Sequence, residues 1–561
     1  MDRRTLIAIV LSFVLLTAFQ FYMAWKYPPA ELTGQQLQAG ETTDPAEVGN
    51  SSGVPTQPKD SSAPPVAGMS SGAPKPMATI QQAVNEDAAS LLTFKNSLVK
   101  GKLNLKGGRL VGMDFIKHTD VLDGNPISFM GINPVESFYQ ESSFLPANGS
   151  TVQAPDVNTQ WKLVGEDTLE GKGTFTLVWE NSDGVVFEKL FTFQEDSYLF
   201  KVEDRIVNNS GSDLGVHHYS QLKRIPIIKE DNMMAMADFQ GPMAFLDDER
   251  HQYAYDEIVE EDIIVNGKAG WSGISDKYFL AAMVPSVLPQ QAQPRRFYFD
   301  YDRPNYRVGM VDNSVIVPAG QSFSASYDLF VGPKEIDILE GSSLALERSI
   351  DYGWFHFLAA PLVKVLNFFY SVVQNYGVAI VLLTLGIKLV FYPLASKSYR
   401  SMNAMKKLQP KIEELKKLHG SDRNKMNEAM MKLYQTHKVN PLGGCLPILV
   451  QIPVFFALYK VLFLSVEMRH APFMLWIPDL SAMDPYYVLP LLMGASMFLQ
   501  TKLNPTPSDP MQAKIMLFLP VIFTVMFLSF PSGLVLYWLV NNVLSIAQQY
   551  YIMKQMEHEK I

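Results

Sequence analysis

The sequence predicts a polytopic α-helical membrane protein with six transmembrane helices and a large all-β exported domain. Hydrophobic residues make up 47% of the 561 residues and charged residues only 18%, whereas soluble proteins carry about 25% charge. Charged residues are scarce in the long apolar runs that follow residue 355. Between residues 90 and 340, segments of strand-like composition are separated by turn signals. These three observations together favour helical spans joined to a β-rich domain.

An apolar run of nearly 20 residues, from about Leu6 to Trp25, follows the basic start of the chain. The apolar core of a cleaved signal peptide is only about 7–15 residues long. Aromatic and Lys residues at the end of the run suit a membrane interface. We therefore expect an uncleaved anchor with its N-terminus in the cytoplasm, and a cleaved signal peptide is the alternative. Nine prolines between Pro28 and Pro76 predict a disordered linker after it.

The strands of the exported domain are clearest at 174–179 and 186–193, where Asn181 to Gly184 provide a turn signal. Strands that recur with short turns predict a large β-sandwich, which lies outside the cytoplasm because it follows the anchor. His217 and His218 are neighbours, so on a strand they point to opposite faces. We expect one to be packed and one solvated, without a catalytic role.

The remainder of the chain is expected to be helical. An apolar stretch from Trp354 to Tyr370 is interrupted by polar residues and Pro361, which predicts an interfacial amphipathic helix. The five spans that follow are expected at about residues 375–394, 446–465, 486–502, 513–530 and 532–551. The full expected division is an anchor (1–27), a linker (28–78), the β-domain (79–343), the interfacial helix (344–372), the second span (373–395), a helical hairpin loop (396–442), the last four spans (443–555) and a short tail (556–561).

The distribution of positive charge gives the orientation of these spans. Residues 397–438 hold eleven Lys or Arg and only four acidic residues. Loops rich in Lys and Arg stay in the cytoplasm. We therefore expect a multi-pass inner-membrane protein with both termini in the cytoplasm and the β-domain in the periplasm.

Polar residues of the spans gather toward the cytoplasmic side. Lys388, Gln451 and Asn541 lie in the inner half or near the middle of their spans, whereas the outer halves are largely apolar. Polar side chains in hydrocarbon face protein or water unless they reach the headgroups. This pattern predicts a pocket that is wet from the cytoplasm and closed outside. Two alternatives stay open: Lys388 snorkels to the inner headgroups, or the amides bond between helices.

Several motifs in the helical region are specific enough to indicate a family. They are Asn440 to Pro447 (NPLGGCLP), Gln451 to Pro453 (QIP), Ala471 to Phe473 (APF), Leu475 to Ile477 (LWI), Asp484 to Tyr487 (DPYY) and Pro531 to Trp538 (PSGLVLYW). Through these motifs the chain resembles the YidC/Oxa/Alb family of membrane protein insertases. The resemblance covers about residues 350–555 by motif. Over residues 1–350 it is architectural, as in the Gram-negative branch.

The resemblance implies a five-helix insertase core with a hydrophilic groove open to the cytoplasm, and an exported β-supersandwich. It implies that the protein inserts integral inner-membrane proteins and helps them fold, alone or with the Sec translocon. The resemblance further implies a chaperone rather than an enzyme, and a function that needs no cofactor. The implied substrate-contacting residues are Lys388, where many members have Arg, and Thr384 and Trp538, the latter often Tyr. We add Gln451, Thr524 and Asn541 to this expected groove.

The resemblance also implies partners. These are nascent membrane proteins and the Sec translocon, with the ribosome, the signal-recognition receptor and anionic lipids as further candidates. The residues expected to dock partners on the cytoplasmic loop are Lys406, Lys407, Lys411, Lys416 and Lys417. A solvated basic face near anionic lipid is the alternative for this loop. The net charge of −9 does not suggest direct binding of nucleic acid.

Two other functional classes compete with this hypothesis. A transporter or channel would favour internal repeats and polar residues through the full thickness of the membrane, and the sequence shows neither. A sugar-binding or sugar-modifying β-domain, merely tethered by the spans, is the second alternative.

Overall fold

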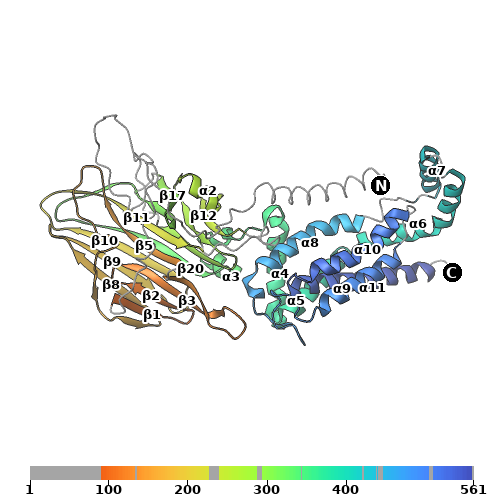
Figure 1. Cartoon of the computed structure of the whole chain (residues 1–561), viewed down its shortest axis with the longest axis horizontal. Coiled ribbons are helices and arrows are strands. Elements are labelled where there is room, and N and C mark those ends of the chain that lie inside the picture. The colour runs from red at the N-terminus through yellow and green to blue at the C-terminus, as the bar shows by residue number, and fades with distance from the viewer. Residues whose placement is uncertain are drawn as a thin grey trace, which may run out of the picture.

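The computed structural model describes residues 90–558, with gaps at 133–135, 227–238, 287–293, 343, 420–422, 438, 440–445 and 505–509. The expected anchor, the expected linker and most of the NPLGGCLP motif lie outside the described residues. Figure 1 shows a β-domain at one end of an elongated molecule, a helical bundle beside it, and a helical hairpin at the far end.

The β-domain contains two large sheets. The first contains β1 (Leu91–Lys95), β2 (Val99–Asn104), β3 (Arg109–Thr119), β4 (Pro126–Ile132), β5 (Ser137–Pro146), β7 (Thr168–Glu170), β11 (Leu214–Ile225), β14 (Ile263–Gly267), β17 (Arg295–Asp302), β18 (Asn305–Val311) and β19 (Val315–Val317). The second contains β6 (Lys162–Val164), β8 (Gly173–Glu180), β9 (Val185–Phe193), β10 (Leu199–Asn208), β12 (Gly241–Leu246), β13 (Glu249–Gln252), β15 (Gly270–Ser275), β16 (Phe279–Pro285) and β20 (Ser322–Pro333). Neighbouring strands are antiparallel except for β1 and β7.

The β8–β9 hairpin forms where the sequence predicts it. The side chain of Asn181 accepts hydrogen bonds from the backbone N–H groups of Asp183 and Val185, both at 2.9 Å. This side chain holds the turn that the sequence signal indicates. Along β9, buried and half-buried residues alternate, as the period of a strand requires.

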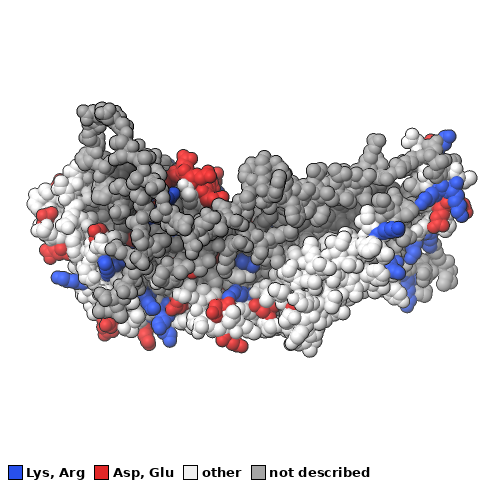
Figure 2. All heavy atoms as spheres, in the orientation of Figure 1, with Lys and Arg blue, Asp and Glu red and all other residues white. Residues whose placement is uncertain are grey.

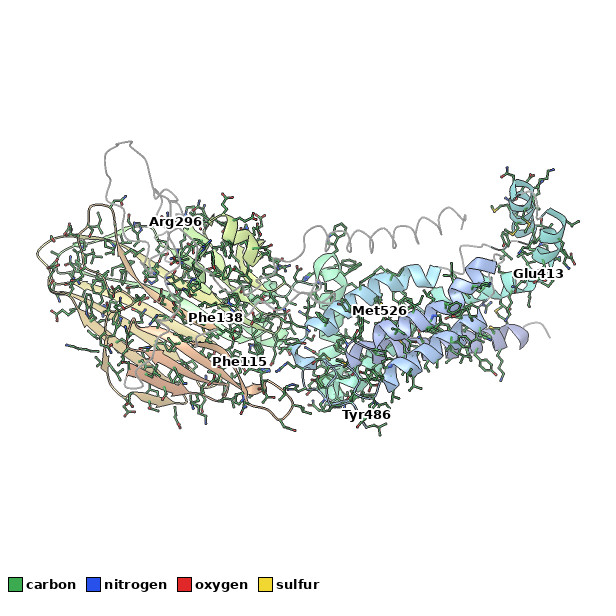
Figure 3. The ribbon with its side chains drawn as sticks, in the orientation of Figure 1. Phe115, Phe138, Arg296, Glu413, Tyr486 and Met526 are labelled. Atoms are coloured by element: carbon green, nitrogen blue, oxygen red, sulfur yellow. The ribbon has the colours of Figure 1, made fainter. Side chains whose placement is uncertain are left out.

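Aromatic side chains hold the two sheets together. The ring of Phe94 on β1 lies 4.9 Å from that of Phe193 and 5.5 Å from that of Phe191, both on β9 of the other sheet. Each buried Phe contributes about 1.5–3 kcal/mol relative to an exposed one. Figure 3 shows Phe115 and Phe138 inside this domain, whereas Glu413 lies on the hairpin at the opposite end.

Charged residues are also buried between the sheets. His218 is 3% exposed and contacts Asp204 at 3.0 Å and Asp312 at 3.2 Å. Lys189 pairs with the other oxygen of Asp204. His217 is half-buried, and its Nδ1 lies 2.9 Å from the carbonyl oxygen of Asp312. The packed member of the predicted pair is therefore His218, held in a buried ionic network.

Helices form the C-terminal part of the chain, as the sequence predicts. They are α4 (His356–Val373), α5 (Tyr376–Val390), α8 (Leu446–Leu464), α9 (Val488–Leu503), α10 (Pro510–Phe527) and α11 (Ser532–His558), with the hairpin helices α6 (Tyr392–His419) and α7 (Arg423–Thr436). The short helices are α2 (Tyr255–Glu260), α3 (Ile336–Gly341), η3 (Leu346–Ser349), η4 (Gly353–Phe355) and η6 (Val466–Met468). Between the β-domain and the hairpin, the visible surface of the bundle carries few charged side chains (Figure 2).

Two helices differ from simple straight spans. By length and composition, the segment Gly353–Val373 is the one described helix that could cross a membrane unaided. The sequence instead predicts an interfacial helix here, and exposed Trp354, Phe357 and Phe368 give it an apolar outer face that suits either placement. The expected second span breaks after Val390, where α5 and α6 meet at a 67° bend.

The end of the bundle that faces the β-domain is closed by loops. Asn375 caps α5, since its Oδ1 accepts from Val378 N at 3.0 Å, and its Nδ2 donates to the carbonyl of Phe473 at 2.8 Å. Ser532 at the start of α11 donates its backbone N–H and its hydroxyl to the carbonyl of Ala482, both at 2.7 Å. The APF and PSG motifs therefore build this closed end.

Candidate functional site

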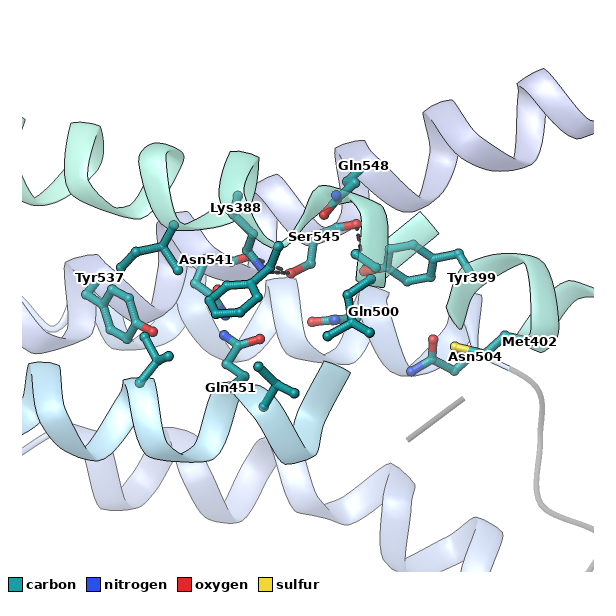
Figure 4. Close-up of a pocket in the computed structure, with 16 residues that line it drawn as sticks. Lys388, Tyr399, Met402, Gln451, Gln500, Asn504, Tyr537, Asn541, Ser545 and Gln548 are labelled. Atoms are coloured by element: carbon teal, nitrogen blue, oxygen red, sulfur yellow. Dashed lines mark hydrogen bonds between the residues drawn. The ribbon is translucent and has the colours of Figure 1, made fainter. Parts of the chain in front are cut away.

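A cavity of about 110 Å³ lies between the helices. Its lining includes residues of α6, the helix at the end of the bundle away from the β-domain in Figure 1. Figure 4 shows its polar side chains converging from α5, α6, α8, α9 and α11. Its lining residues are Ile387, Lys388, Phe391, Leu394, Ala395, Tyr399, Met402, Val450, Gln451, Val454, Gln500, Asn504, Tyr537, Asn541, Ser545 and Gln548. The structure thus brings together three of the predicted residues, Lys388, Gln451 and Asn541.

Lys388 is half-buried on α5 and points across the cavity to α11. Its Nζ donates a hydrogen bond to Ser545 Oγ at 2.7 Å. Among the described residues, no carboxylate forms a salt bridge with this ammonium group. Placing a charged lysine in hydrocarbon costs at least about 2.5 kcal/mol of free energy. The polar cavity reduces this cost, but no described carboxylate neutralises the charge of Lys388.

The other polar groups of the cavity are mainly carboxamides. Gln451, Gln500, Asn504, Asn541 and Gln548 all line it. A carboxamide can both donate and accept hydrogen bonds, so this set can satisfy the backbone of a hydrophilic peptide whatever its side chains. Among the described lining residues there is one cation and no carboxylate. The cavity is therefore suited to neutral polar and acidic segments.

Apolar packing closes the bundle beyond this cavity. Ile380 and Leu383 on α5, Leu458 on α8 and Val535 on α11 are at most 4% exposed and belong to one hydrophobic cluster. They lie toward the ends of the helices that meet the APF and PSG loops. A polar segment in the cavity would meet this apolar layer before it could reach the β-domain.

The structure does not place the other predicted groove residues in the cavity. Thr384 is 1% exposed, and its hydroxyl donates to the Ile380 carbonyl of its own helix at 2.6 Å. The hydroxyl of Thr524 likewise donates to the Pro520 carbonyl at 2.7 Å. The resemblance implies Thr384 and depth along the span indicates Thr524, but neither threonine is among the residues that line the cavity. Their contact with a client stays a prediction.

Trp538 lines a second, apolar cavity of about 670 Å³. This cavity lies between α8 and α10 and is bordered by α11. Its lining residues are Phe455, Phe456, Tyr459, Met483, Phe523, Val525, Met526, Phe527, Ser529, Phe530 and Trp538. The Trp538 ring lies 4.5 Å from that of Phe455 and 5.1 Å from that of Phe527. Trp538 is therefore part of an aromatic wall rather than of the polar cavity.

The predicted docking lysines are on the exposed side of α6. Lys406, Lys407, Lys411, Lys416 and Lys417 are all exposed. Leu408 and Ile412, in contrast, are each 5% exposed and pack in the hairpin. Figure 2 shows Lys and Arg gathered at this end of the molecule. The hairpin therefore presents a basic surface on α6, the helix that also lines the cavity with Tyr399 and Met402.

Several polar residues that line the cavity are not among those predicted from the sequence, and Ser545 and Tyr399 are the two whose contacts matter most for Lys388. Ser545 is 3% exposed and receives the Lys388 hydrogen bond. Tyr399, on the first part of α6, donates its hydroxyl to the Ser545 carbonyl at 3.4 Å. The spacing of Asn541 and Ser545, four residues apart, places them on one helix face and could have indicated Ser545. Pro393, the second residue of α6, is a sequence signal for the bend, but it does not indicate that Tyr399 contacts α11.

Comparisons with known proteins cover both parts of the chain. Residues 91–365 match the family described as the YidC periplasmic domain, and residues 368–559 match the family described as the 60Kd inner membrane protein. A protein of Magnetococcus marinus named membrane protein insertase YidC is 75% identical over 559 residues, covering 100% of both chains. A protein of the same name from Methylobacillus flagellatus is 38% identical and covers 99% of this chain and 97% of its own.

Among solved structures, a crystal structure of an active YidC insertase with its first transmembrane domain resolved is also similar. It is 20% identical, covers 82% of this chain and 92% of its own, and has a TM-score of 0.37.

Proposed function

The chain belongs to the YidC family of membrane protein insertases, and from this premise we propose that it inserts inner-membrane proteins by taking up their hydrophilic segments in the cavity at Lys388. The protein is an insertase with a β-rich periplasmic domain and a helical C-terminal region. The observation that carries the proposal is the polar cavity with one uncompensated cation and five carboxamides among its described lining residues.

In this mechanism each of the two cavities contacts a different segment of the client. The hydrophilic segment enters the polar cavity from the cytoplasm, where carboxamides bond its backbone and Lys388 attracts its carboxylates. The apolar helix of the client rests against the aromatic wall formed by Phe455, Phe527 and Trp538. Release into lipid is favoured by burial of apolar surface, at roughly 25 cal/mol per Å². The proposal requires no cofactor and no hydrolysis.

Short helices support a local thinning of the membrane in this mechanism. Helix α5 has 15 residues and α9 has 16, which corresponds to lengths of roughly 23–24 Å at 1.5 Å per residue. The hydrocarbon core of a bilayer is about 30 Å thick. A bilayer that thins to match these helices shortens the apolar path of the client.

The proposed topology has six spans, of which the last five, α5, α8, α9, α10 and α11, form the insertase core. Both termini lie in the cytoplasm, and α4 lies along the periplasmic interface. The basic surface of α6, at the opposite end of the molecule from the β-domain, supports this orientation. The same lysines support contacts with anionic lipids, the ribosome and the signal-recognition receptor, and cooperation with the Sec translocon is proposed from the family.

Site-specific photocrosslinking to a stalled nascent client tests this proposal. Probes at Gln451 and Asn541 report on the polar cavity, a probe at Trp538 reports on the aromatic wall, and Leu389, 64% exposed on α5, is a matched control outside both. We expect the client's hydrophilic segment to crosslink at Gln451 and Asn541 and its apolar helix at Trp538. Crosslinks at Leu389 without any at Gln451 or Asn541 would contradict the proposal.

A further inference from the structure

Ser545 is a buried residue of the cavity whose hydroxyl group both donates and accepts a hydrogen bond. Its hydroxyl donates to the carbonyl of Asn541, one turn earlier on α11, at 2.7 Å. Its oxygen accepts the hydrogen bond from Lys388 Nζ, also at 2.7 Å. Since the hydroxyl proton is fixed on the Asn541 carbonyl, the lone pairs of Ser545 Oγ are directed to the ammonium group (Figure 4).

This geometry decides between two positions for the lysine. Lys388 lies two residues from the end of α5, so its long side chain could extend to the cytoplasmic headgroups. It instead crosses the cavity to α11, and Ser545 is the partner that the described residues offer there. A hydrogen bond to a charged group is stronger than one between neutral groups, so this contact favours the inward position.

We propose that Ser545 is a positioning residue that holds the ammonium group of Lys388 inside the cavity for acidic client segments. The inference rests on the proposed function, in which Lys388 attracts client carboxylates. A lysine ammonium has three N–H donors. Ser545 takes one, so two remain for a carboxylate, and the client does not have to displace the serine.

The proposal predicts an effect that depends on client charge. Without the Ser545 hydroxyl, the lysine loses its partner on α11 and extends to the headgroups, where it no longer meets the client. Neutral polar segments, bonded by the carboxamides, do not need the ammonium group. A role of Ser545 limited to helix packing would impair both kinds of client alike.

The test compares two versions of one client, with Asp and Glu or with Asn and Gln in the exported segment, in vesicles containing full-length protein. We expect Ser545→Ala to lower insertion of the acidic version by about tenfold to a hundredfold, the size of one hydrogen bond to a charged group, and to leave the neutral version unchanged. Ser545→Thr, which keeps the hydroxyl, should retain insertion of both. In a Lys388→Met background, Ser545→Ala should cause no additional loss.

The matched control is Ser496 on α9, a second buried serine. Its hydroxyl donates to the Met493 carbonyl at 2.6 Å and accepts from Asn542 at 3.1 Å, without contacting Lys388. Ser496→Ala should affect both client versions equally. Equal losses with Ser545→Ala, or further loss in the Lys388→Met background, would overturn the role of Ser545. If Lys388→Met itself showed no preference between the two versions, the proposed role of Lys388 would fail, and this inference with it.

Discussion

The indole Nε1 of Trp476 donates a hydrogen bond to Asp484 Oδ1 at 3.1 Å, joining two loop motifs at the closed end of the bundle. Asp484 is 1% exposed and also accepts from the backbone N–H groups of Tyr486 at 3.0 Å and Leu489 at 2.6 Å. Its carboxylate therefore holds both the loop and the first turn of α9.

Asp484→Ala should destabilise the protein strongly, because it leaves three donors without their acceptor. Each unsatisfied buried donor costs about 1–3 kcal/mol, so we expect a loss of at least about 2 kcal/mol in the free energy of unfolding. Thermal unfolding of the full chain in detergent measures this. Asp484→Asn, which keeps one acceptor oxygen, should lose less. A melting temperature unchanged by Asp484→Ala would show that the carboxylate does not hold this loop.

Gly377 on α5 has no room for a side chain. A Cβ at this position would lie 2.0 Å from the ring of Phe473 in the APF motif, whereas one at Gly386 on the same helix would meet nothing within 4 Å. Gly377→Ala should therefore displace Phe473 and lower the melting temperature. Gly386→Ala, the matched control, should be neutral or stabilising by about 0.5–1 kcal/mol. Equal effects of the two substitutions would contradict the close packing of α5 on this loop.

The buried ionic network of the β-domain predicts a loss of stability at alkaline pH. Burial disfavours the charged form of His218, but hydrogen bonds and charges from Asp204 and Asp312 outweigh it and raise its pKa to about 9. An unfolded histidine has a pKa of about 6.5. The stabilisation is therefore fully present below about pH 6.5 and is lost as the pH rises through 9.

We expect the melting temperature of the β-domain transition, followed in the full chain by circular dichroism, to fall between pH 7 and pH 9.5. His218→Gln should be less stable at neutral pH and should show a weaker dependence over the same range. A wild-type melting temperature that stays constant or rises over this range would argue against a protonated His218 in the folded protein.

Arg469 fixes the β-domain to the bundle. Its guanidinium donates to the carbonyl of Thr119 at the end of β3 and to that of Asp120. Arg469→Ala should loosen the junction, and spin labels at Asp123 and Tyr486 should then give a broader distance distribution. The control is Arg205→Ala, which removes an arginine whose partner, Glu188, lies within the β-domain. An unchanged distribution in the Arg469 variant would mean that other contacts hold the junction.

Local patterns account for the parts of the structure that the sequence predicts well. The Asn181 turn and the strands beside it follow from turn chemistry and strand-like composition, and α5, α8, α9, α10 and α11 lie in the apolar runs of the sequence. Lys388, Gln451 and Asn541 were predicted because depth along a span can be counted. Depth along a span does not give the rotation of its helix, so it does not distinguish Thr384 and Thr524, which do not line this cavity, from the residues that do; their contact with a client stays a prediction. The contacts of Ser545 and Tyr399 depend on the bend after α5, a tertiary feature.

The central claim is that the cavity at Lys388 is wet from the cytoplasm and closed toward the periplasm. Its most direct test is labelling with a membrane-impermeant maleimide of Gln451→Cys, Asn541→Cys and, as a control in the apolar layer, Leu383→Cys. Each variant carries Cys445→Ser, because Cys445 is the one cysteine of the sequence. We predict labelling at positions 451 and 541 from the cytoplasmic side alone, and none at position 383. Failure of both cavity positions to label from the cytoplasm, or labelling of either from the periplasm, would contradict this account.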